Sequence, residues 1–423
     1  MSQFNEKIHV LSLGVGNILA LNKSTMAVIN DADLIIGAEH HLESLSSIDK
    51  TKIIDKVNFP SPFSDLIPLL HENINKKIIV CASGDALFYG VGKMLLDNLG
   101  QENIIFHPNI SSMQVAFHKT GMEWGNAVIH SLHGRPIESL SRCLLDNALI
   151  GVFTDQKSNP AAIAKLLVHQ GYAKSEILVC EALGKSTERI SAFIAEELSQ
   201  CNKKFDVLNI CIIKCKGANH CFHGMPGIAD DCFETGKQPG KGMISKREVR
   251  LAILSLMEAY PNDTAWDVGA GCGSVSIEWA LQNKNGKIYA IEHNQIRMNY
   301  FNQNMNKFGV NLNVIPVPAS APEACDNLPA PDVIFIGGHG GDLATMLEYC
   351  WEKLKQNGRL VVSAVMQSSV KVIEKFARQH QNFRGEFLKL QVSKTNTLTK
   401  IDALHELKPV TLFKITKRLS SCK

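Results

Sequence analysis

The sequence has almost no excess of charge of either sign. Lys and Arg together number 44 and Asp and Glu number 41, so 423 residues carry a formal net charge of only +3. Proteins that bind nucleic acid through its phosphates usually show a strongly basic domain or face. We therefore expect neither a nucleic acid nor a membrane surface among the partners of this chain.

Long apolar runs are also missing. No stretch of the sequence approaches the ~18 apolar residues that a membrane-spanning helix requires. The first residues, "MSQFNEKIHVLSLGVG", have no basic segment followed by a long apolar one, and no small-residue cleavage site. We therefore expect a cytoplasmic chain without a membrane segment.

The cysteines lack the spacing of common metal sites. None of the twelve belongs to a C-x-x-C pair, and in a large chain without a secretory signal we expect reduced thiols. One group could still form a small zinc site, and it comprises Cys211, Cys215, Cys221, Cys232, His220 and His223. Because Cys211 lies within the apolar, strand-like run "VLNICIIK", we predict no metal and keep zinc as an alternative.

The composition changes shortly after residue 217. The stretch "KGANHCFHGMPGIADDCFETGKQPGKGMISKREV" is rich in Gly, Pro, His and Lys and has no sustained apolar period. A chain of this length has room for two or three domains. We predict a first domain over 1–217, a linker over 218–240 and a second domain over 241–423.

The second domain alternates strand and helix patterns. We expect strands at 264–268, 287–292, 312–317, 332–337, 359–365, 385–392 and 409–416. We expect helices at 274–283, 295–307, 341–355 and 368–380. This order predicts an α/β, Rossmann-like fold, in which a mainly parallel sheet has helices on both faces and ends in a β-β pair.

The first domain alternates less regularly. We expect strands at 9–16, 33–38, 77–85, 103–107, 127–131, 148–153, 176–181 and 206–213. The order predicts two α/β lobes, with the change of lobe near 130–145.

A glycine-rich turn follows the first strand of the second domain, in "DVGAGCGSVSIEWA", which begins at Asp267. Gly269, Gly271 and Gly273 remove Cβ atoms, so that backbone N–H groups can approach a ligand at the carboxyl end of the strand. Residue 274 is Ser, so the G-x-G-x-x-G spacing of dinucleotide sites is absent. The carboxylate of Asp267 suits a cationic ligand, such as a sulfonium with an amino group, better than a diphosphate.

A second acid follows the next strand. Glu292 ends "KIYAIE", at about the ~20-residue offset of acids that bind ribose hydroxyls. A solvated Glu at the end of a strand is the alternative. Strand, glycine turn, helix, strand and acid together predict a nucleoside site.

These motifs resemble class I S-adenosylmethionine (SAM) methyltransferases, and among them the C15-methylating, decarboxylating enzymes of cobalamin biosynthesis. Further matches are "MISKREVRLAIL" (243–254), "YAIEHN" (289–294), "SAPEAC" (320–325) and "PDVIFIGGHGG" (331–341). The resemblance implies that SAM is held by the glycine turn, the acid and the turn before "APEA", where family members commonly have Asp at position 320. The implied contacts are Asp267, Gly269, Gly271, Gly273, Ser274, Glu292, Ser320 and Ala321.

The first domain resembles class III tetrapyrrole methylases, in particular the C5-methylating ones. The matches are "LGVGN" (13–17), "ASGDALFYGVG" (82–92), "HPNISSMQVAFHKTGMEW" (107–124), "SLHGRP" (131–136), "VFTDQKSNPAAIAKLL" (152–167) and "CEALGKSTERI" (180–190). The resemblance implies a two-lobed fold with SAM between the lobes. The implied contacts are Leu13, Gly84, Asp85, Phe88, Ser111, Ser112 and Ala182.

Taken together, the two halves resemble the fused, bifunctional methyltransferases of cobalamin biosynthesis. The resemblance implies methylation of C5 of precorrin-6 by the first domain, and methylation of C15 with decarboxylation of the C12 acetate by the second. It further implies SAM in each domain, a tetrapyrrole substrate, and a dimer through the first domain or a higher assembly.

The substrate would need cationic or N–H contacts for its acetates and propionates. The candidates are Lys246, Arg250, Gly338, Gly340, His133, Arg135 and Lys185. Arg247 and His339 are the candidates for positioning the substrate or donating a proton. We expect Lys246, Arg247 and Arg250 to form one face of a helix that starts after Ser245. A solvated basic face on a helix capped by Ser245, and a loop histidine without a role, are the alternatives.

Two other functions fit parts of the sequence. Class I folds also include RNA methyltransferases, which would require a basic face and binding that weakens steeply with salt. A SAM-binding regulator would bind the ligand without transferring its methyl group.

Overall fold

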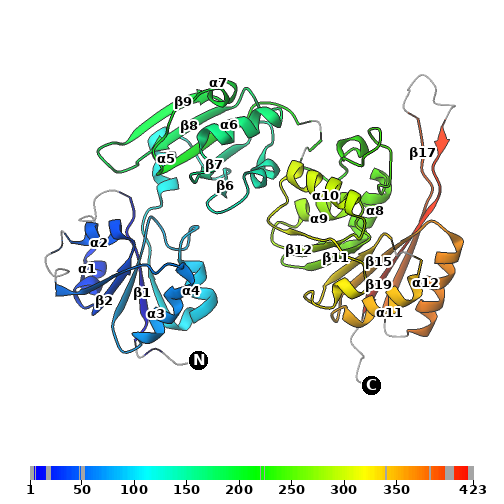
Figure 1. Ribbon diagram of the computed structural model, residues 1–423, viewed down its shortest axis with the longest axis horizontal. Helices are drawn as coiled ribbons and strands as arrows, with labels where there is room; N and C mark the ends of the chain where they lie inside the picture. Colours follow the sequence, from blue (N-terminus) through cyan, green and yellow to red (C-terminus); the bar gives the residue numbers. More distant parts are fainter. Residues whose placement is uncertain are drawn as a thin grey trace. The chain divides into compact units, whose positions relative to one another are not determined.

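The computed structural model describes residues 4, 6–15, 21–46, 48, 53–219, 221–222, 224–338, 341–380, 383–395 and 404–417. The chain forms two compact units (Figure 1). The first unit is Met1–Gly134 with Asp146–Gly217, and the second is Arg135–Leu145 with Ala218–Lys423.

The first lobe of the first unit is a parallel sheet with the strand order β3-β2-β4-β1-β5. The strands are β1 (Ile8–Ser12), β2 (Leu34–Gly37), β3 (Asp55–Asn58), β4 (Ile78–Ala82) and β5 (Ile104–His107). The helices are α1 (Lys23–Asn30), α2 (Glu39–Leu45), η3 (Phe63–Asp65), α3 (Leu66–Glu72), α4 (Gly92–Leu99) and η4 (Gln101–Asn103). Helices α3 and α4 cover one face and α1 and α2 the other. Both faces are therefore buried, which explains why β2 and β4 are apolar throughout.

The second lobe is a mixed sheet with the strand order β6-β7-β10-β8-β9. The strands are β6 (Val128–Ser131), β7 (Leu149–Phe153), β8 (Glu176–Glu181), β9 (Arg189–Ile194) and β10 (Asn209–Lys214). The helices are α5 (Ser112–Thr120), α6 (Pro160–His169) and α7 (Ala195–Ser199). Because α5 packs Met113 and Phe117 against Ile210 and Ile212, the lobe changes directly after β5. The expected change near 130–145 was wrong.

The second unit is built on a seven-stranded sheet with the order β13-β12-β11-β14-β15-β19-β16. The strands are β11 (Thr264–Val268), β12 (Lys287–Ile291), β13 (Val314–Val317), β14 (Val333–Ile336), β15 (Arg359–Ala364), β16 (Phe383–Leu390) and β19 (Val410–Lys417), with a small ribbon of β17 (Ser393–Lys394) and β18 (His405–Glu406). The first five strands in this order are parallel, and β19 pairs antiparallel with both β15 and β16. The predicted α/β, Rossmann-like class is confirmed.

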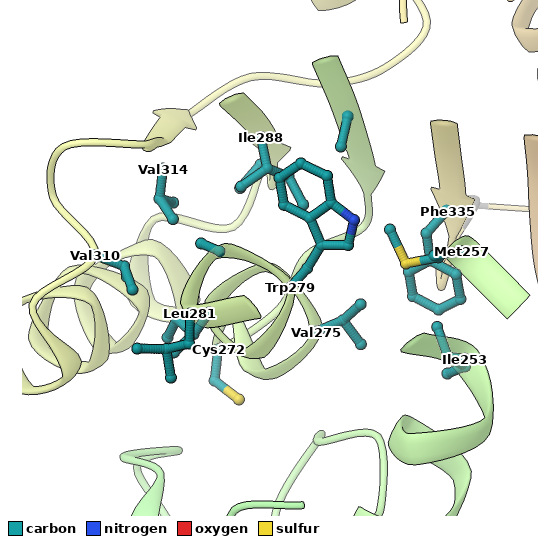
Figure 2. Packing of buried hydrophobic residues seen from close by; sticks show 14 of the residues in the cluster. Ile253, Met257, Cys272, Val275, Trp279, Leu281, Ile288, Val310, Val314 and Phe335 are labelled. Carbon is teal, nitrogen blue, oxygen red and sulfur yellow. The ribbon is translucent and has the colours of Figure 1, made fainter. Parts of the chain in front are cut away.

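Helices cover both faces of this sheet. They are α8 (Arg247–Met257), α9 (Ser274–Gln282), α10 (Gln295–Phe308), α11 (Leu343–Lys353) and α12 (Gln367–Gln379), with short turns η5 (Ile137–Cys143), η6 (Asp230–Cys232) and η7 (Glu323–Cys325). Helices α8, α9 and α10 share one core cluster, and α11 and α12 share another. Figure 2 shows Trp279 of α9 among Val275 and Ile288 in the first cluster.

An excursion of the chain, residues 135–145, belongs to the second unit although the residues before and after it belong to the first. Its Arg142 is buried and donates to Asn313 Oδ1 at 3.0 Å and to the carbonyl oxygen of Ala280 at 2.9 Å. At Gly309 a Cβ would lie 2.5 Å from the carbonyl oxygen of Glu138, so the excursion packs closely on the end of α10.

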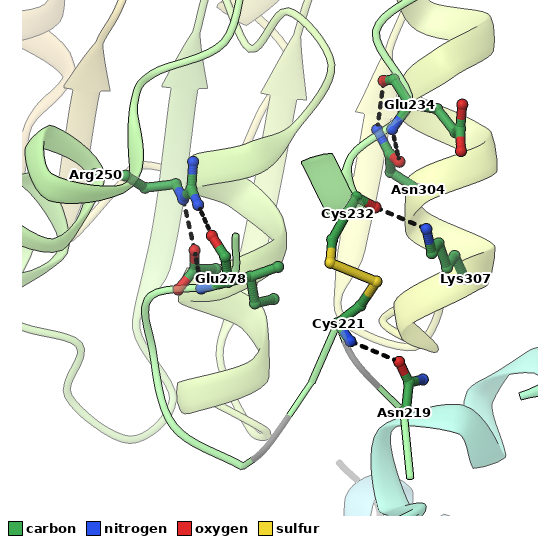
Figure 3. Close-up of a disulfide and its surroundings, with 9 residues drawn as sticks. Asn219, Cys221, Cys232, Glu234, Arg250, Glu278, Asn304 and Lys307 are labelled. Carbon is green, nitrogen blue, oxygen red and sulfur yellow. Dashed lines mark hydrogen bonds and ion pairs between the residues drawn. A yellow bond between two sulfur atoms is a disulfide. The ribbon is translucent and has the colours of Figure 1, made fainter. Parts of the chain in front are cut away.

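The segment 218–240, expected as a linker, also packs on the second unit. Ile228 and Phe233 lie in its core. Cys221 and Cys232 form a disulfide with their Cα atoms 5.3 Å apart (Figure 3), so the expectation of reduced thiols was wrong for this pair. The pairing also removes two ligands from the alternative zinc site, and Cys211 lies inside β10.

His220 and His223 of that alternative site lie outside the described residues. Within the described part of the chain, no cluster of three or more His, Cys, Asp or Glu side chains is placed to hold a metal ion. Among the same residues, no helix combines the length and the apolar character needed to cross a bilayer.

Candidate active sites

The second unit has a pocket of about 980 Å³ at the carboxyl ends of β11, β12, β14 and β15. Ligands bind at this edge of open α/β sheets because the turns there present backbone N–H groups. The glycine turn after β11 forms its floor, and residues before α8 and around β16 and β19 complete its wall. The predicted contacts among the described residues that line it are Asp267, Gly269, Gly271, Ser274, Glu292, Ser320, Ala321, Gly338 and Lys246.

The three glycines of the turn have positive φ angles of 76°, 60° and 85° at Gly269, Gly271 and Gly273. A Cβ at Gly269 would lie 2.6 Å from the backbone of Gly338, and one at Gly273 would lie 2.5 Å from the ring of Phe301. At Gly271 a Cβ would meet only the carbonyl oxygen of Met243, at 3.6 Å. Two glycines therefore allow close packing, whereas Gly271 leaves space in the pocket. Gly273 itself does not line the pocket.

Glu292 lies at the end of β12 and is only 3% exposed, so the alternative of a solvated side chain was wrong. Its Oε2 accepts a hydrogen bond from the backbone N–H of Gly271 at 3.0 Å, and Oε1 accepts one from the backbone N–H of Asn294 at 2.8 Å. A carboxylate has about four acceptor positions. Glu292 can therefore fix the glycine turn and still accept two hydroxyl groups.

Asp267 is buried beside the pocket. Its Oδ2 accepts from Ser276 Oγ at 2.5 Å, but among the described residues its buried Oδ1 has no hydrogen-bond partner. Burial raises the pKa of Asp267 to about 7, and the nearby charge of Glu292 acts in the same direction. A positively charged ligand would relieve both effects. This carboxyl group therefore fits the sulfonium or ammonium group of SAM.

The three basic residues near the start of α8 do not share one face. The helix begins at Arg247 with Lys246 as its N-cap, so the expected cap by Ser245 was wrong. Lys246 lines the pocket, but Arg247 is exposed and outside it, 3.6 Å from Glu248.

Arg250 is fully buried and cannot contact substrate, so that prediction was wrong. It lies on the apolar side of α8, where its Nε donates to Glu278 Oε1 at 2.5 Å (Figure 3). Its Nη1 donates to Asp230 at 3.2 Å.

Two expected residues, His339 and Gly340, lie outside the described residues. Sequence reasoning also missed Arg297 and Lys408, which line the pocket. Arg297 lies 3.7 Å from Glu292, in the first turn of the helix after β12. Because ligands bind at the carboxyl ends of the strands, this position could have been selected from the sequence. Lys408 comes from the approach to β19 and had no sequence signal.

The first unit has a pocket of about 920 Å³ lined by both of its lobes. Every predicted cofactor contact lines it, together with two predicted substrate contacts: Leu13, Gly84, Asp85, Phe88, Ser111, Ser112, Ala182, His133 and Lys185. Arg135 does not line it and belongs to the second unit, so its predicted place in this pocket was wrong.

Hydrogen bonds fix the turns around this pocket. Gly14 and Gly84 exchange backbone hydrogen bonds of 3.1 and 3.2 Å, which join the ends of β1 and β4. Asp85 Oδ1 accepts from the backbone N–H of Leu87 at 2.9 Å, which closes its turn. Ser111 caps α5 by accepting from the backbone N–H of Gln114 at 3.2 Å. The structure also places His40, His41 and Ser83 here, which sequence reasoning did not select.

Two family models match the chain. Residues 7–199 match the "Tetrapyrrole (Corrin/Porphyrin) Methylases", and residues 237–417 match the "Precorrin methyltransferase domain".

A "Precorrin-6Y C(5,15)-methyltransferase [decarboxylating]" of Sinorhizobium sp is 30% identical over 411 residues, 96% of each chain. A protein of the same name from Mycobacterium tuberculosis is 27% identical over 97% of this chain and all of that one. A "Probable cobalt-precorrin-6B C(15)-methyltransferase (decarboxylating)" of Methanothermobacter thermautotrophicus is 36% identical over 139 residues, 33% of this chain and 70% of that one. The chain therefore belongs to the decarboxylating precorrin-6Y C(5,15)-methyltransferases, a family of SAM-dependent enzymes of cobalamin biosynthesis.

Proposed function

We propose that the chain transfers methyl groups from SAM to C5 and C15 of precorrin-6Y and removes the C12 acetate carboxyl group as carbon dioxide. We further propose two SAM sites, one in each unit. One observation supports this above the others: each unit has its own pocket, of about 980 and 920 Å³, at the carboxyl ends of its strands and beside a glycine turn.

We assign the C5 methylation to the first domain and the C15 methylation with decarboxylation to the second. The division follows the resemblance of the two sets of motifs to separate methylases. It is supported by the matches of 7–199 and 237–417 to two different families. A dimer through the first domain is part of the same proposal. Light scattering of the purified chain measures whether the chain is a dimer in solution.

No protein nucleophile is required for this chemistry. SAM supplies an electrophilic methyl group, and the meso carbons of the reduced tetrapyrrole are enamine-like and nucleophilic. The task of the chain is to align carbon, methyl and sulfur, which alone can lower the barrier by several kcal/mol. In the second unit, the unpartnered oxygen of Asp267 would face the cationic part of SAM, and Glu292 would accept the ribose hydroxyls.

Cationic side chains would hold the acidic arms of the substrate. Lys246 in the second pocket and Lys185 in the first both line their pockets, and each can donate to a carboxylate. Loss of carbon dioxide leaves an electron pair that a protonated imine of the substrate ring can accept. The chain therefore needs to hold the acetate arm in place and provide a proton to the ring.

Mass spectrometry of the pigment after incubation with precorrin-6Y and SAM tests the proposal. We expect a product that has gained two methyl groups and lost one carbon dioxide. Gly271→Arg fills the open space beside Glu292 and should abolish the decarboxylation with one methylation. Asp85→Ala should abolish the other methylation.

Two variants control for indirect effects. Gly121 also has a positive φ, of 65°, but lies in neither pocket and has open space beside it, so Gly121→Arg should retain both reactions. Asp97→Ala removes an exposed carboxylate that pairs with Lys93, and this variant should also retain both reactions. An unchanged pigment with SAM binding retained would contradict the proposal and favour a regulator.

A further inference from the structure

Three polar side chains meet where two neighbouring strands of the first lobe end. Strands β2 and β4 are parallel neighbours, so their carboxyl ends lie at the same edge. His40 and His41 follow β2 in the first turn of α2, and Ser83 follows β4 directly. Nε2 of His41 lies 2.7 Å from Ser83 Oγ, and Nε2 of His40 lies 3.4 Å from it. All three line the pocket of the first unit.

The hydrogen bonds of His41 define which of its nitrogens carries the proton. The backbone N–H of Ala38 donates to Nδ1 of His41 at 3.2 Å, so Nδ1 holds a lone pair. The proton of the neutral ring is then on Nε2, which donates to Ser83 Oγ. Burial, and secondly the neighbouring His40, lower the pKa of His41 to about 4, so the ring is neutral at neutral pH.

Close packing holds this ring in place. A Cβ at the buried Gly37 would lie 3.2 Å from the Cβ of His41 and 3.1 Å from that of Cys81, so the backbone at Gly37 packs closely against His41. The ring of Phe59 contacts it edge-on, with centroids 6.3 Å apart. His41 is 5% exposed, whereas Ser83 is exposed in the pocket. A rigid buried donor therefore orients an accessible hydroxyl group.

The hydroxyl group of Ser83 keeps its own proton for a further partner. Its oxygen already accepts from His41, and the 3.4 Å distance to His40 is beyond a strong hydrogen bond. A ligand oxygen can therefore displace His40. Ser83 is directly followed by Gly84 and Asp85, which line the same pocket, so the hydroxyl group lies where the ligands of the first unit would bind.

We propose that Ser83, oriented by His41, donates a hydrogen bond to a carboxylate oxygen of a ligand in the first unit's pocket. The proposal rests on the proposed function, because both SAM and the tetrapyrrole carry carboxylates there. Ser83 is thus a binding residue, and His41 is a positioning residue that acts through it.

Steady-state kinetics of the full chain test this proposal. The reaction to follow is the methylation assigned to the first unit, which Asp85→Ala is expected to abolish. The concentrations of SAM and precorrin-6Y are varied in turn. Ser83→Ala should raise the KM of the ligand whose carboxylate is bound by about tenfold, as for other hydrogen bonds to charged groups, with kcat nearly unchanged. Ser83→Thr keeps the hydroxyl group and should restore most of the affinity. A higher KM for SAM identifies the methionyl carboxylate, and a higher KM for precorrin-6Y identifies a tetrapyrrole arm.

The role of His41 is tested by a double-mutant cycle. His41→Leu should raise the same KM when Ser83 is present and have little further effect in the Ser83→Ala chain. His41→Gln, which retains an N–H donor, should recover part of the loss. The second methylation and the loss of carbon dioxide, measured in the same samples, show that the second unit is intact, and circular dichroism compared with the wild type shows that the first unit of each variant is folded.

Unchanged KM values in Ser83→Ala, or an undiminished effect of His41→Leu in the Ser83→Ala chain, would overturn the proposal. Failure of the proposed function appears separately, as a wild-type chain that adds no methyl group to precorrin-6Y. In that case the tetrapyrrole is excluded as the source of the carboxylate that Ser83 binds. Calorimetry of SAM with Gly271→Arg and with Gly271→Arg/Ser83→Ala then decides, and equal Kd values overturn the role of Ser83.

Discussion

The backbone N–H of Gly271 donates to Oε2 of Glu292 at 3.0 Å, so the glycine turn and the acid of the second unit form one hydrogen-bonded structure. Glu292→Gln keeps the size of the side chain but places an amide where two acceptor oxygens face backbone N–H groups. We expect SAM binding to the second unit to weaken about tenfold or more. Calorimetry of the Asp85→Ala chain, with and without Glu292→Gln, measures this.

Glu348→Gln is the matched control for that substitution, because Glu348 is exposed and pairs with His380 outside the pocket. It should leave SAM binding unchanged. Equal affinities in the Glu292→Gln and Glu348→Gln chains would show that Glu292 does not contact the ligand.

SAM binding to the second unit should depend on pH around neutrality. Burial raises the pKa of Asp267 to about 7, and the ionised form is the one that attracts a cation. The affinity should therefore rise as the pH increases through about 7, as measured by calorimetry on either side of that value. In the Asp267→Asn chain the affinity should be lower and should lose this dependence, whereas an unchanged pH profile would rule out Asp267 as its source.

The same carboxyl group should affect stability with the opposite sign. Its pKa is higher in the folded chain than its ordinary value of 3.8, so the folded state holds the proton more tightly. The stabilisation is complete below about pH 4 and is lost as the pH rises towards and through about 7. Without SAM, the free energy of unfolding of the Asp267→Asn chain should decrease less between about pH 4 and about pH 7 than that of the wild type. Urea unfolding at several pH values measures this difference.

Arg250 should be structural rather than catalytic. Arg250→Met leaves Glu278 buried without its cation, and we expect a loss of about 3–5 kcal/mol in the free energy of unfolding. Arg247→Ala, at an exposed neighbour on the same helix, should change it by less than about 0.5 kcal/mol. Urea unfolding followed by circular dichroism compares the two, and similar losses would contradict the assignment.

Arg142 should stabilise the second unit although it lies between two segments of the first. Arg142→Ala removes the donors to Asn313 and to the carbonyl oxygen of Ala280, and we expect a loss of about 2–3 kcal/mol. Arg135→Ala, at the exposed start of the same excursion, should have a much smaller effect. Hydrogen exchange of α9 and α10 would locate the change, and protection equal to that of the wild type would contradict this role.

Local chemistry explains which parts of the site were predictable. Gly269, Gly271 and Gly273 all adopt positive φ angles, and such a conformation strongly favours glycine. Asp267 is the penultimate residue of β11 and Glu292 directly follows β12, so the strand pattern alone places them at the ligand-binding edge. The strand and helix ranges of the second domain were predictable for the same reason, because long periodic segments determine them.

Pairings between distant residues were not predictable. Helical spacing does not reveal that Arg250 turns towards Glu278, since the partner is on another helix. The contact of His41 with Ser83 depends on two strands being neighbours, although 42 residues separate them in the chain. The change of lobe was misplaced because the sequence pattern does not show which sheet α5 covers, and its packing against Ile210 and Ile212 is a contact between distant segments.

The excursion 135–145 makes the two halves inseparable by a single cut. A fragment that begins at residue 218 would lack the segment that covers Asn313 and the end of α10, and would expose the polar groups that Arg142 now binds. A synthetic peptide of residues 135–145 would have a ready-made binding site on such a fragment. The boundary between the two units is therefore interleaved along the gene, and recombination at one point could not exchange either unit intact.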